Sequence, residues 1–233
     1  MKTLKILVLI LALTLAAWTA AEPAKVTGMI IERTENGFAF STEEGIRFAA
    51  LSEQTVTETD GELAVGDVVT VTFSGRTDRR MLNADSVVCR KLIGTVESVE
   101  PASEEEEAYF LLTPEDGSET VRVNLDEISS DRVIPGLPVT VYYSGAMTRS
   151  IPPQITAQYV RGTVLRGEIT DVTEDGQVTL ETEDGETVIL HCSEETLVFA
   201  ELTIGSRVSV SVAPQVLLSL PAQYGALDIL PIS

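Results

Sequence analysis

The sequence contains a unit of about 70 residues that is written three times, and this repeat limits the possible folds more than any other feature. One landmark is a glycine that precedes a β-rich run, at Gly66, Gly136 and Gly205, with spacings of 70 and 69 residues. Another is an alanine that opens the last apolar run, at Ala84, Ala157 and Ala226, with spacings of 73 and 69 residues. We therefore expect three similar modules, each packed against its neighbours, in place of one large core.

Each unit has the pattern of short β-strands. Apolar and polar residues alternate along runs rich in Val, Ile, Thr and Phe, as is typical of half-buried strands. An acidic glycine turn follows the second run of each unit, at Glu44-Gly45, Asp116-Gly117 and Asp184-Gly185. Glycine accepts a positive φ, so these turns predict hairpins. The pattern gives about five strands in each unit and no amphipathic helix of ordinary length.

Five strands, with the longest connection after the third, is the order of an OB-type barrel. Three β-sandwich halves or three SH3-like barrels would give similar patterns. We expect an all-β fold of three tandem five-stranded OB-like barrels, which we call the first, second and third repeats, at residues 22–91, 92–162 and 163–233. The linkers at Arg90-Lys91 and 161–164 are short, so the barrels should form a compact or gently curved row.

The first 21 residues are typical of a secretory signal peptide. A basic start at Lys2 and Lys5 precedes twelve uncharged residues, and small residues lead to a cleavage point after Ala21. An uncleaved anchor is the alternative reading. Trp18 stands where a lipoprotein signal has cysteine, so lipidation at this position is not possible. We expect an extracytoplasmic protein, secreted or associated with the cell envelope, without a transmembrane segment in the mature chain.

The charge is strongly acidic. The chain has 36 Asp and Glu residues against 16 Lys and Arg residues, a formal net charge of −20. A polyanion repels nucleic-acid phosphates, so we expect no nucleic-acid partner. The charge is also a gradient, because residues 25–91 sum to −3, residues 92–162 to −8 and residues 163–233 to −10.

The recurring pattern is a glycine-led first strand, a Thr-Glu-Asp-Gly turn, a Gly-x-x-Val-x-Val run and a final Ala-x-x-Val run. It resembles tandem small OB-like β-barrel domains of unknown function, found in exported and lipoprotein-type proteins of Gram-positive bacteria. The segment from Tyr143 to Gln154 is similar to a stretch in small exported lipoproteins of the same bacteria. The resemblance implies a fold and a compartment but no catalytic residues. The first repeat departs from it between Arg79 and Asn83.

Two loops before the last strand of a repeat are candidate binding sites, because that connection commonly flanks the ligand face of OB barrels. The first repeat carries the basic residues Arg76, Arg79 and Arg80 there, which suit an anion or an acidic polymer. The second repeat carries Tyr142, Tyr143 and Arg149, which suit a sugar or a peptide. The alternative for the arginine loop is a solvated surface that pairs with nearby acids.

These features predict an exported, non-enzymatic binding or scaffold module, with an envelope polymer or a protein as a possible partner. One alternative is weak divalent-cation binding through the repeated acidic turns. A hydrolase with carboxylates between barrels is the least favoured. The single histidine and two cysteines do not form a metal-ligand motif, and we expect no catalytic residue, no metal and no cofactor. Cys89 and Cys192 are expected to be buried and free.

Overall fold

The computed structural model describes residues 23–74, 80–103, 106–125, 133–143, 145–217 and 219–232. These residues form β-strands and connections, without a helix, so the all-β prediction is confirmed. No helix long and apolar enough to cross a membrane occurs among them. The predicted signal peptide, with Trp18, lies outside the described residues.

The strands follow the three repeats along the chain. The first repeat contains β1 (Ala24–Thr34), β2 (Gly37–Thr42), β3 (Gly45–Ala50), β4 (Val56–Thr59), β5 (Val68–Phe73) and the first half of β6 (Met81–Glu100). The second repeat contains the rest of β6 and β7 (Tyr109–Pro114), β8 (Val121–Asn124), β9 (Pro138–Tyr143), β10 (Gln154–Thr156) and β11 (Tyr159–Arg161). The third repeat contains β12 (Val164–Val172), β13 (Gln177–Thr182), β14 (Thr187–His191), β15 (Leu197–Val198), β16 (Arg207–Leu217) and β17 (Ala222–Pro231).

The three repeats pair their strands in the same order. In the first repeat β1 pairs with β2 and β5, β2 with β3, and β6 with β3 in parallel and with β5 antiparallel. The third repeat has the same pairings among β12, β13, β14, β16 and β17. In the second repeat the last strand is divided, so that β10 pairs with β8 and β11 pairs with β9. The turn glycines Gly45, Gly117 and Gly185 have positive φ values, as the hairpin prediction requires.

The first strand of each repeat shows why glycine recurs there. A Cβ at Gly28, Gly94 or Gly167 would collide with a backbone carbonyl of the neighbouring strand. Two residues further on, each of these strands contains a register irregularity, after Ile30, Val96 and Ile169. Because a bulge increases the local bend and twist of a strand, the glycine and the bulge together let it curve around the core.

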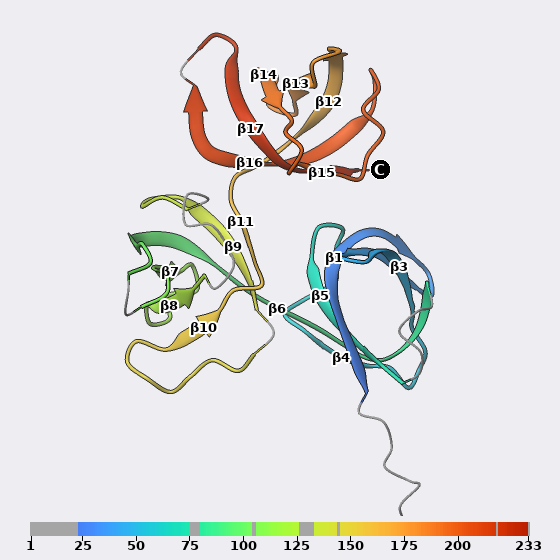
Figure 1. The fold of residues 1–233 in the computed structure, drawn as a ribbon, viewed down its shortest axis with the longest axis vertical. Helices are drawn as coiled ribbons and strands as arrows, with labels where there is room; N and C mark the ends of the chain where they lie inside the picture. Colours follow the sequence, from blue (N-terminus) through green and yellow to red (C-terminus); the bar gives the residue numbers. More distant parts are fainter. Residues whose placement is uncertain are drawn as a thin grey trace, which may run out of the picture.

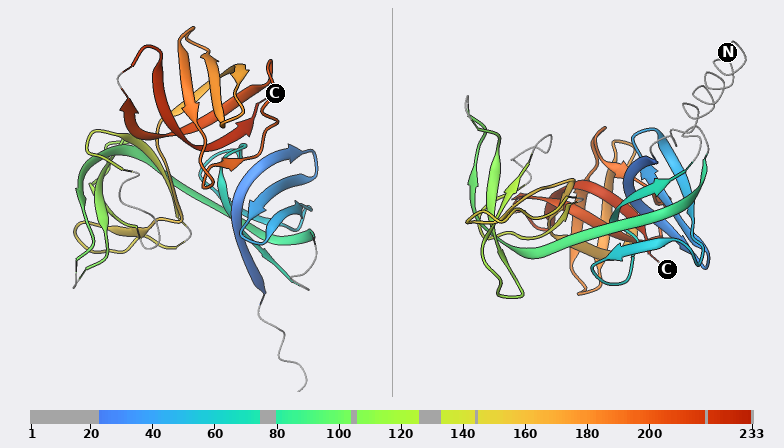
Figure 2. Two further views of the ribbon diagram at one scale, coloured as in Figure 1. Left: turned by 45° about the horizontal axis from the view of Figure 1, so that its top comes forward. Right: turned by 90° about the horizontal axis from the view of Figure 1, so that it is seen from below.

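The prediction of three separate barrels is wrong. β6 is one continuous strand of 20 residues, and it pairs with β5 in the first repeat and with β7 and β9 in the second. Arg90 and Lys91, predicted as a linker, lie inside this strand and pair with Tyr143 and Tyr142. The first two repeats therefore share an 11-stranded sheet, and the third forms a 6-stranded sheet. Figures 1 and 2 show β6 crossing from the first repeat to the second, while the third repeat lies against both.

Each repeat has its own apolar cluster, but the cores are not independent. The cluster of the first repeat includes Tyr142 from the second repeat and Leu230 from the third. Tyr159 and Phe199 pack against the same cluster from the second and third repeats. The third repeat therefore sits on both of its neighbours, as Figure 1 shows at the top of the view.

Candidate functional site

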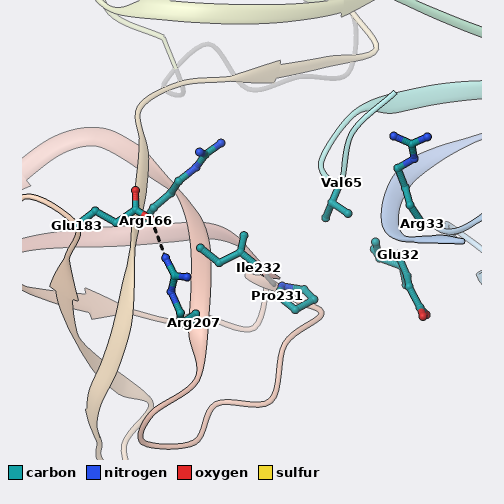
Figure 3. Close-up of a pocket in the computed structure, with 9 residues that line it drawn as sticks. Glu32, Arg33, Val65, Arg166, Glu183, Arg207, Pro231 and Ile232 are labelled. Atoms are coloured by element: carbon teal, nitrogen blue, oxygen red, sulfur yellow. Dashed lines mark hydrogen bonds and ion pairs between the residues drawn. The ribbon is translucent and has the colours of Figure 1, made fainter. Parts of the chain in front are cut away.

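A cleft of about 640 Å³ lies between the first and third repeats. One wall comes from β1 and the turn before β5, with Ile31, Glu32, Arg33 and Val65. The other wall comes from the third repeat, with Arg166, Glu183, Arg207, Pro231 and Ile232. Figure 3 shows the two walls facing each other across the cleft. Its volume is in the range of ligand-binding sites, roughly 300–1,000 Å³.

The distribution of basic residues singles out this cleft. Residues 163–233 contain only two basic residues, Arg166 and Arg207, against 12 acidic ones. Both arginines line the cleft. Arg33 adds a third guanidinium from the first repeat, whereas Glu32 and Glu183 are the acidic lining residues. The described lining of the cleft therefore carries three guanidinium groups against two carboxylates, on a chain whose net charge is −20.

The three arginines differ in how much of their charge is already paired. Arg207 contacts Glu183 at 3.0 Å, and Arg33 contacts Glu62 at 3.0 Å and also donates to the carbonyl of Leu63. The side chain of Arg166 is exposed and has no ion-pair or hydrogen-bond partner among the described residues. Arg166 is thus the cation in the cleft that is available to an anion from outside.

A second cavity of about 370 Å³ continues behind the cleft. The two share Val65, Arg166 and Ile232, so Arg166 lies where they meet. The inner cavity is further lined by residues of the second and third repeats: Thr140, Tyr142, Arg161, Val164, Ser209 and Leu230. Residues of all three repeats therefore line these two neighbouring cavities.

Two buried aspartates hold Tyr142 and Arg161, which line the second cavity, and the first of them is Asp67. It follows the turn glycine Gly66 and is 4% exposed. Its carboxylate accepts a hydrogen bond from the Tyr142 hydroxyl at 3.1 Å, contacts Lys91 Nζ at 3.3 Å and accepts the backbone N–H of Ala64 at 2.8 Å. Burial and the neighbouring carboxylate of Asp67 raise the pKa of Tyr142, which keeps its hydroxyl a donor.

The second buried aspartate is Asp228 of β17, which is completely buried. Its carboxylate accepts hydrogen bonds from the Tyr159 hydroxyl at 2.7 Å and from Arg161 Nη2 at 2.9 Å. The rings of Tyr142 and Tyr159 lie 6.4 Å apart between their centroids. We call Asp67, Lys91, Tyr142, Tyr159, Arg161 and Asp228 the junction network, because these six residues join the three repeats.

The residues predicted for the arginine loop are only partly placed. Arg76 and Arg79 lie outside the described residues. Arg80 is exposed, and its carbonyl accepts the backbone N–H of Phe48 at 2.7 Å. Of the three, Arg80 is the one described, and it lines neither the cleft nor the inner cavity.

The second predicted set does not form one surface. Tyr142 is buried in the junction network, whereas Tyr143 packs against the core of the second repeat. They are neighbours on β9, and successive strand residues point to opposite faces, so they cannot make a shared aromatic platform. Arg149 is exposed in the connection before β10 and lies apart from the cleft lining.

The structure gives little material for metal binding or catalysis in the part of the chain that it describes. It contains no group of three or more His, Cys, Asp or Glu side chains that could hold a metal ion. Cys89 and Cys192 are both free; Cys89 is buried and Cys192 half-buried. Burial, together with the nearby carboxylate of Asp67, raises the pKa of Cys89 to about 11, so this thiol is not activated as a nucleophile.

Comparison with known proteins yields structures only. No protein-family model and no curated protein matches the chain. A multidomain protein with nucleic acid binding domains from Streptococcus pneumoniae is 12% identical, with a TM-score of 0.23 over 87% of this chain and 72% of the other. Drosophila Unr CSD456 is 14% identical, with a TM-score of 0.22 over 90% of this chain and 98% of the other. Likeness at these scores carries no argument about what this chain binds.

The exclusion of nucleic-acid partners does not follow from a net charge of −20, so this inference is wrong. The physical reason is that a net charge is a sum over the whole chain, whereas binding depends on the local field. Here both arginines of the strongly acidic third repeat line the same cleft.

Proposed function

We propose that this protein is an exported, non-enzymatic binding or scaffold module that holds an anionic partner in the cleft between its first and third repeats. The observation that carries the proposal is the position of Arg166 and Arg207. They are the only basic residues of residues 163–233, and both line the cleft. The side chain of Arg166 has no partner among the described residues, so an anion can bind the guanidinium without displacing an existing ion pair.

A binding role without a catalytic step fits the state of three carboxylates, those of Glu183, Asp67 and Asp228. Glu183 in the cleft contacts Arg207 at 3.0 Å, and Asp67 and Asp228 are each engaged by a tyrosine hydroxyl and a cationic side chain. Carboxylates that already hold such partners act as structural acceptors and are poorly placed to take a proton from a substrate. The junction network instead supports a fixed arrangement of the two cleft walls.

Thermal melting of the full chain in matched ionic strength tests this proposal. Inorganic phosphate, citrate, oligoglutamate and a short oligothymidylate are the anionic probes, and spermidine is the cationic control. A ligand that binds only the folded state raises the melting temperature, by an amount that grows with its concentration. We expect at least one anion to raise the melting temperature of the natural chain and of Arg149→Ala, but not that of Arg166→Ala.

Arg149→Ala is the matched control, because Arg149 is also an exposed arginine and lies outside the cleft. The proposal is overturned if no anion stabilises the natural chain, or if Arg166→Ala responds as the natural chain does. A response to oligothymidylate alone that needs Arg166 would identify phosphodiesters as the anionic group.

The compartment is tested separately. Its support is the sequence of the first 21 residues, with a basic start, an uncharged run and small residues before Glu22. Mass spectrometry of the protein recovered from its native cells should find an unmodified N-terminus at Glu22. A chain that retains its first 21 residues in the cytoplasmic fraction would contradict export.

A further inference from the structure

The inner cavity presents hydrogen-bond donors next to Arg166, whose side chain has no partner among the described residues. Arg166 of β12 and Ser209 of β16 are direct cross-strand partners in an antiparallel pair. Residues that face each other in this way project from the same side of the sheet, so the guanidinium and the hydroxyl lie together. Both residues line the inner cavity, and Thr140 of β9 lines it from the second repeat.

The hydroxyl groups of Ser209 and Thr140 make no hydrogen bond within the described structure. Ser209 is 7% exposed, and neither its Oγ nor the Oγ1 of Thr140 has a hydrogen-bond partner among the described residues. Both hydroxyls line the inner cavity that Arg166 also lines, so they are available to an oxygen-bearing ligand.

The wider cleft supplies an apolar surface beside these donors. Its walls contain Ile31, Val65, Pro231 and Ile232, and its volume is about 640 Å³. Ligand sites of small molecules combine mostly apolar walls with a few placed polar groups. Since the two cavities meet at Arg166, one ligand can place an acidic group in the inner cavity and a larger body in the cleft.

We propose that Arg166, Ser209 and Thr140 bind the oxyanion of a small organic acid, a phosphate monoester or a carboxylate, whose apolar body lies in the cleft. This inference rests on the proposed function and names the ligand class of the same site. The guanidinium offers paired N–H groups to two oxygens, and the hydroxyls donate to the remaining oxygen atoms. The three donors belong to the second and third repeats, and the apolar surface belongs to the first and third.

Isothermal titration of the full chain with three probes tests the proposal. Phenyl phosphate and benzoate share an aromatic body and differ in the oxyanion, and benzyl alcohol has the body without the charge. We expect one or both anions to bind and benzyl alcohol not to bind. Comparison of the two anions identifies whether the site selects phosphate or carboxylate.

Two conservative variants test the hydroxyl donors. Ser209→Ala and Thr140→Val each remove one donor with little change in volume. Each should weaken binding by about tenfold, because the loss of one hydrogen bond to a charged group reduces affinity by about that factor. Ser211→Ala is the matched control, because Ser211 is a buried serine on the same strand and does not line either cavity. Ser211→Ala should bind phenyl phosphate and benzoate with the same affinity as the natural chain.

The outcomes separate this inference from the proposed function. If anions bind through Arg166 but Ser209→Ala and Thr140→Val bind as tightly as the natural chain, the donor set is wrong and the proposed function stands. If neither phenyl phosphate nor benzoate binds at millimolar concentration, or if benzyl alcohol binds equally, the ligand class is wrong. If no anion of any kind stabilises the chain, both proposals fail.

Discussion

Arg161 of the second repeat donates a hydrogen bond from Nη2 to Oδ1 of Asp228 in the third repeat, over 2.9 Å. The Asp228 side chain is fully buried and that of Arg161 is 11% exposed. A pair this deeply buried stabilises a structure only while both partners are present, because either one alone is a buried, uncompensated charge. This contact therefore ties the third repeat to the second beside the inner cavity, which Arg161 lines.

The first prediction concerns that pair. Asp228→Ala should lower the free energy of unfolding by about 3–5 kcal/mol, because it leaves the Arg161 guanidinium buried without its partner. Urea unfolding of Arg161→Ala, Asp228→Ala and the double variant gives the coupling between them. The control cycle is Arg207 with Glu183, whose side chains are 52% and 50% exposed, and it should give a coupling below about 1 kcal/mol. Equal coupling in the two cycles would contradict the prediction.

The second prediction concerns Gly66, which has a φ of 92°. A Cβ at this position would overlap the Arg161 guanidinium and approach Leu230. Gly66→Ala should therefore cost more stability than the backbone effect alone, which is about 1 kcal/mol or more for a non-glycine residue at positive φ.

Gly136 and Gly205 are matched controls for Gly66. They hold the equivalent turns of the other repeats, with φ values of 85° and 90°, and an added Cβ would meet nothing within 4 Å. In thermal or urea unfolding, Gly136→Ala and Gly205→Ala should lose only the stability that the backbone effect accounts for. If the three substitutions destabilise the chain equally, the packing of Arg161 against this turn is wrong.

The third prediction concerns alkaline pH. Burial raises the pKa of Cys89 from 9.0 to about 11, so above pH 9 the unfolded chain loses this proton before the folded chain does. The stabilisation is fully present below pH 9 and is lost as the pH rises toward 11. Between pH 8 and pH 11, the free energy of unfolding should decrease less for Cys89→Ala than for the natural chain, and the two decreases should differ by on the order of 2 kcal/mol. An identical pH dependence in the two chains would refute this assignment.

The fourth prediction concerns the shared strand. An insertion of Gly-Ser-Gly-Ser between Arg90 and Lys91 interrupts β6 where it pairs with β9, and it separates Lys91 from its contacts with Asp60 and Asp67. We expect a loss of more than about 3 kcal/mol, since this breaks a buried network. The same insertion between Asp116 and Gly117, an exposed turn, should be tolerated. Tolerance at both points would mean that residues 90–91 act as a linker.

The sequence was informative where structure is decided locally. Gly117 and Gly185 mark hairpins because a positive φ at a turn is a property of one residue. The continuity of β6 is not local. Arg90 and Lys91 read as a polar linker, and they are in a strand because β9 pairs with them on one side while the connection from β4 supplies Asp60 on the other.

The candidate site was missed for a similar reason. Arg166 and Arg207 stand out as the only basic residues of residues 163–233, so the signal was present in the sequence. Their convergence on Arg33 depends on how the third repeat packs against the first, through contacts such as Leu230 in the core of the first repeat. The sequence pattern instead favoured Tyr142, which is buried because the repeats pack against one another in the same way.

A crystal structure of the full chain with 4-bromophenyl phosphate tests the central claim most directly, because the anomalous signal of bromine fixes the position of the ligand. The account predicts the phosphate group beside Arg166, within hydrogen-bond distance of Ser209, and the bromine in the cleft between Val65 and Ile232. Ligand density only at Arg80 or Arg149, or a cleft without ligand at a concentration that saturates binding in solution, would contradict it.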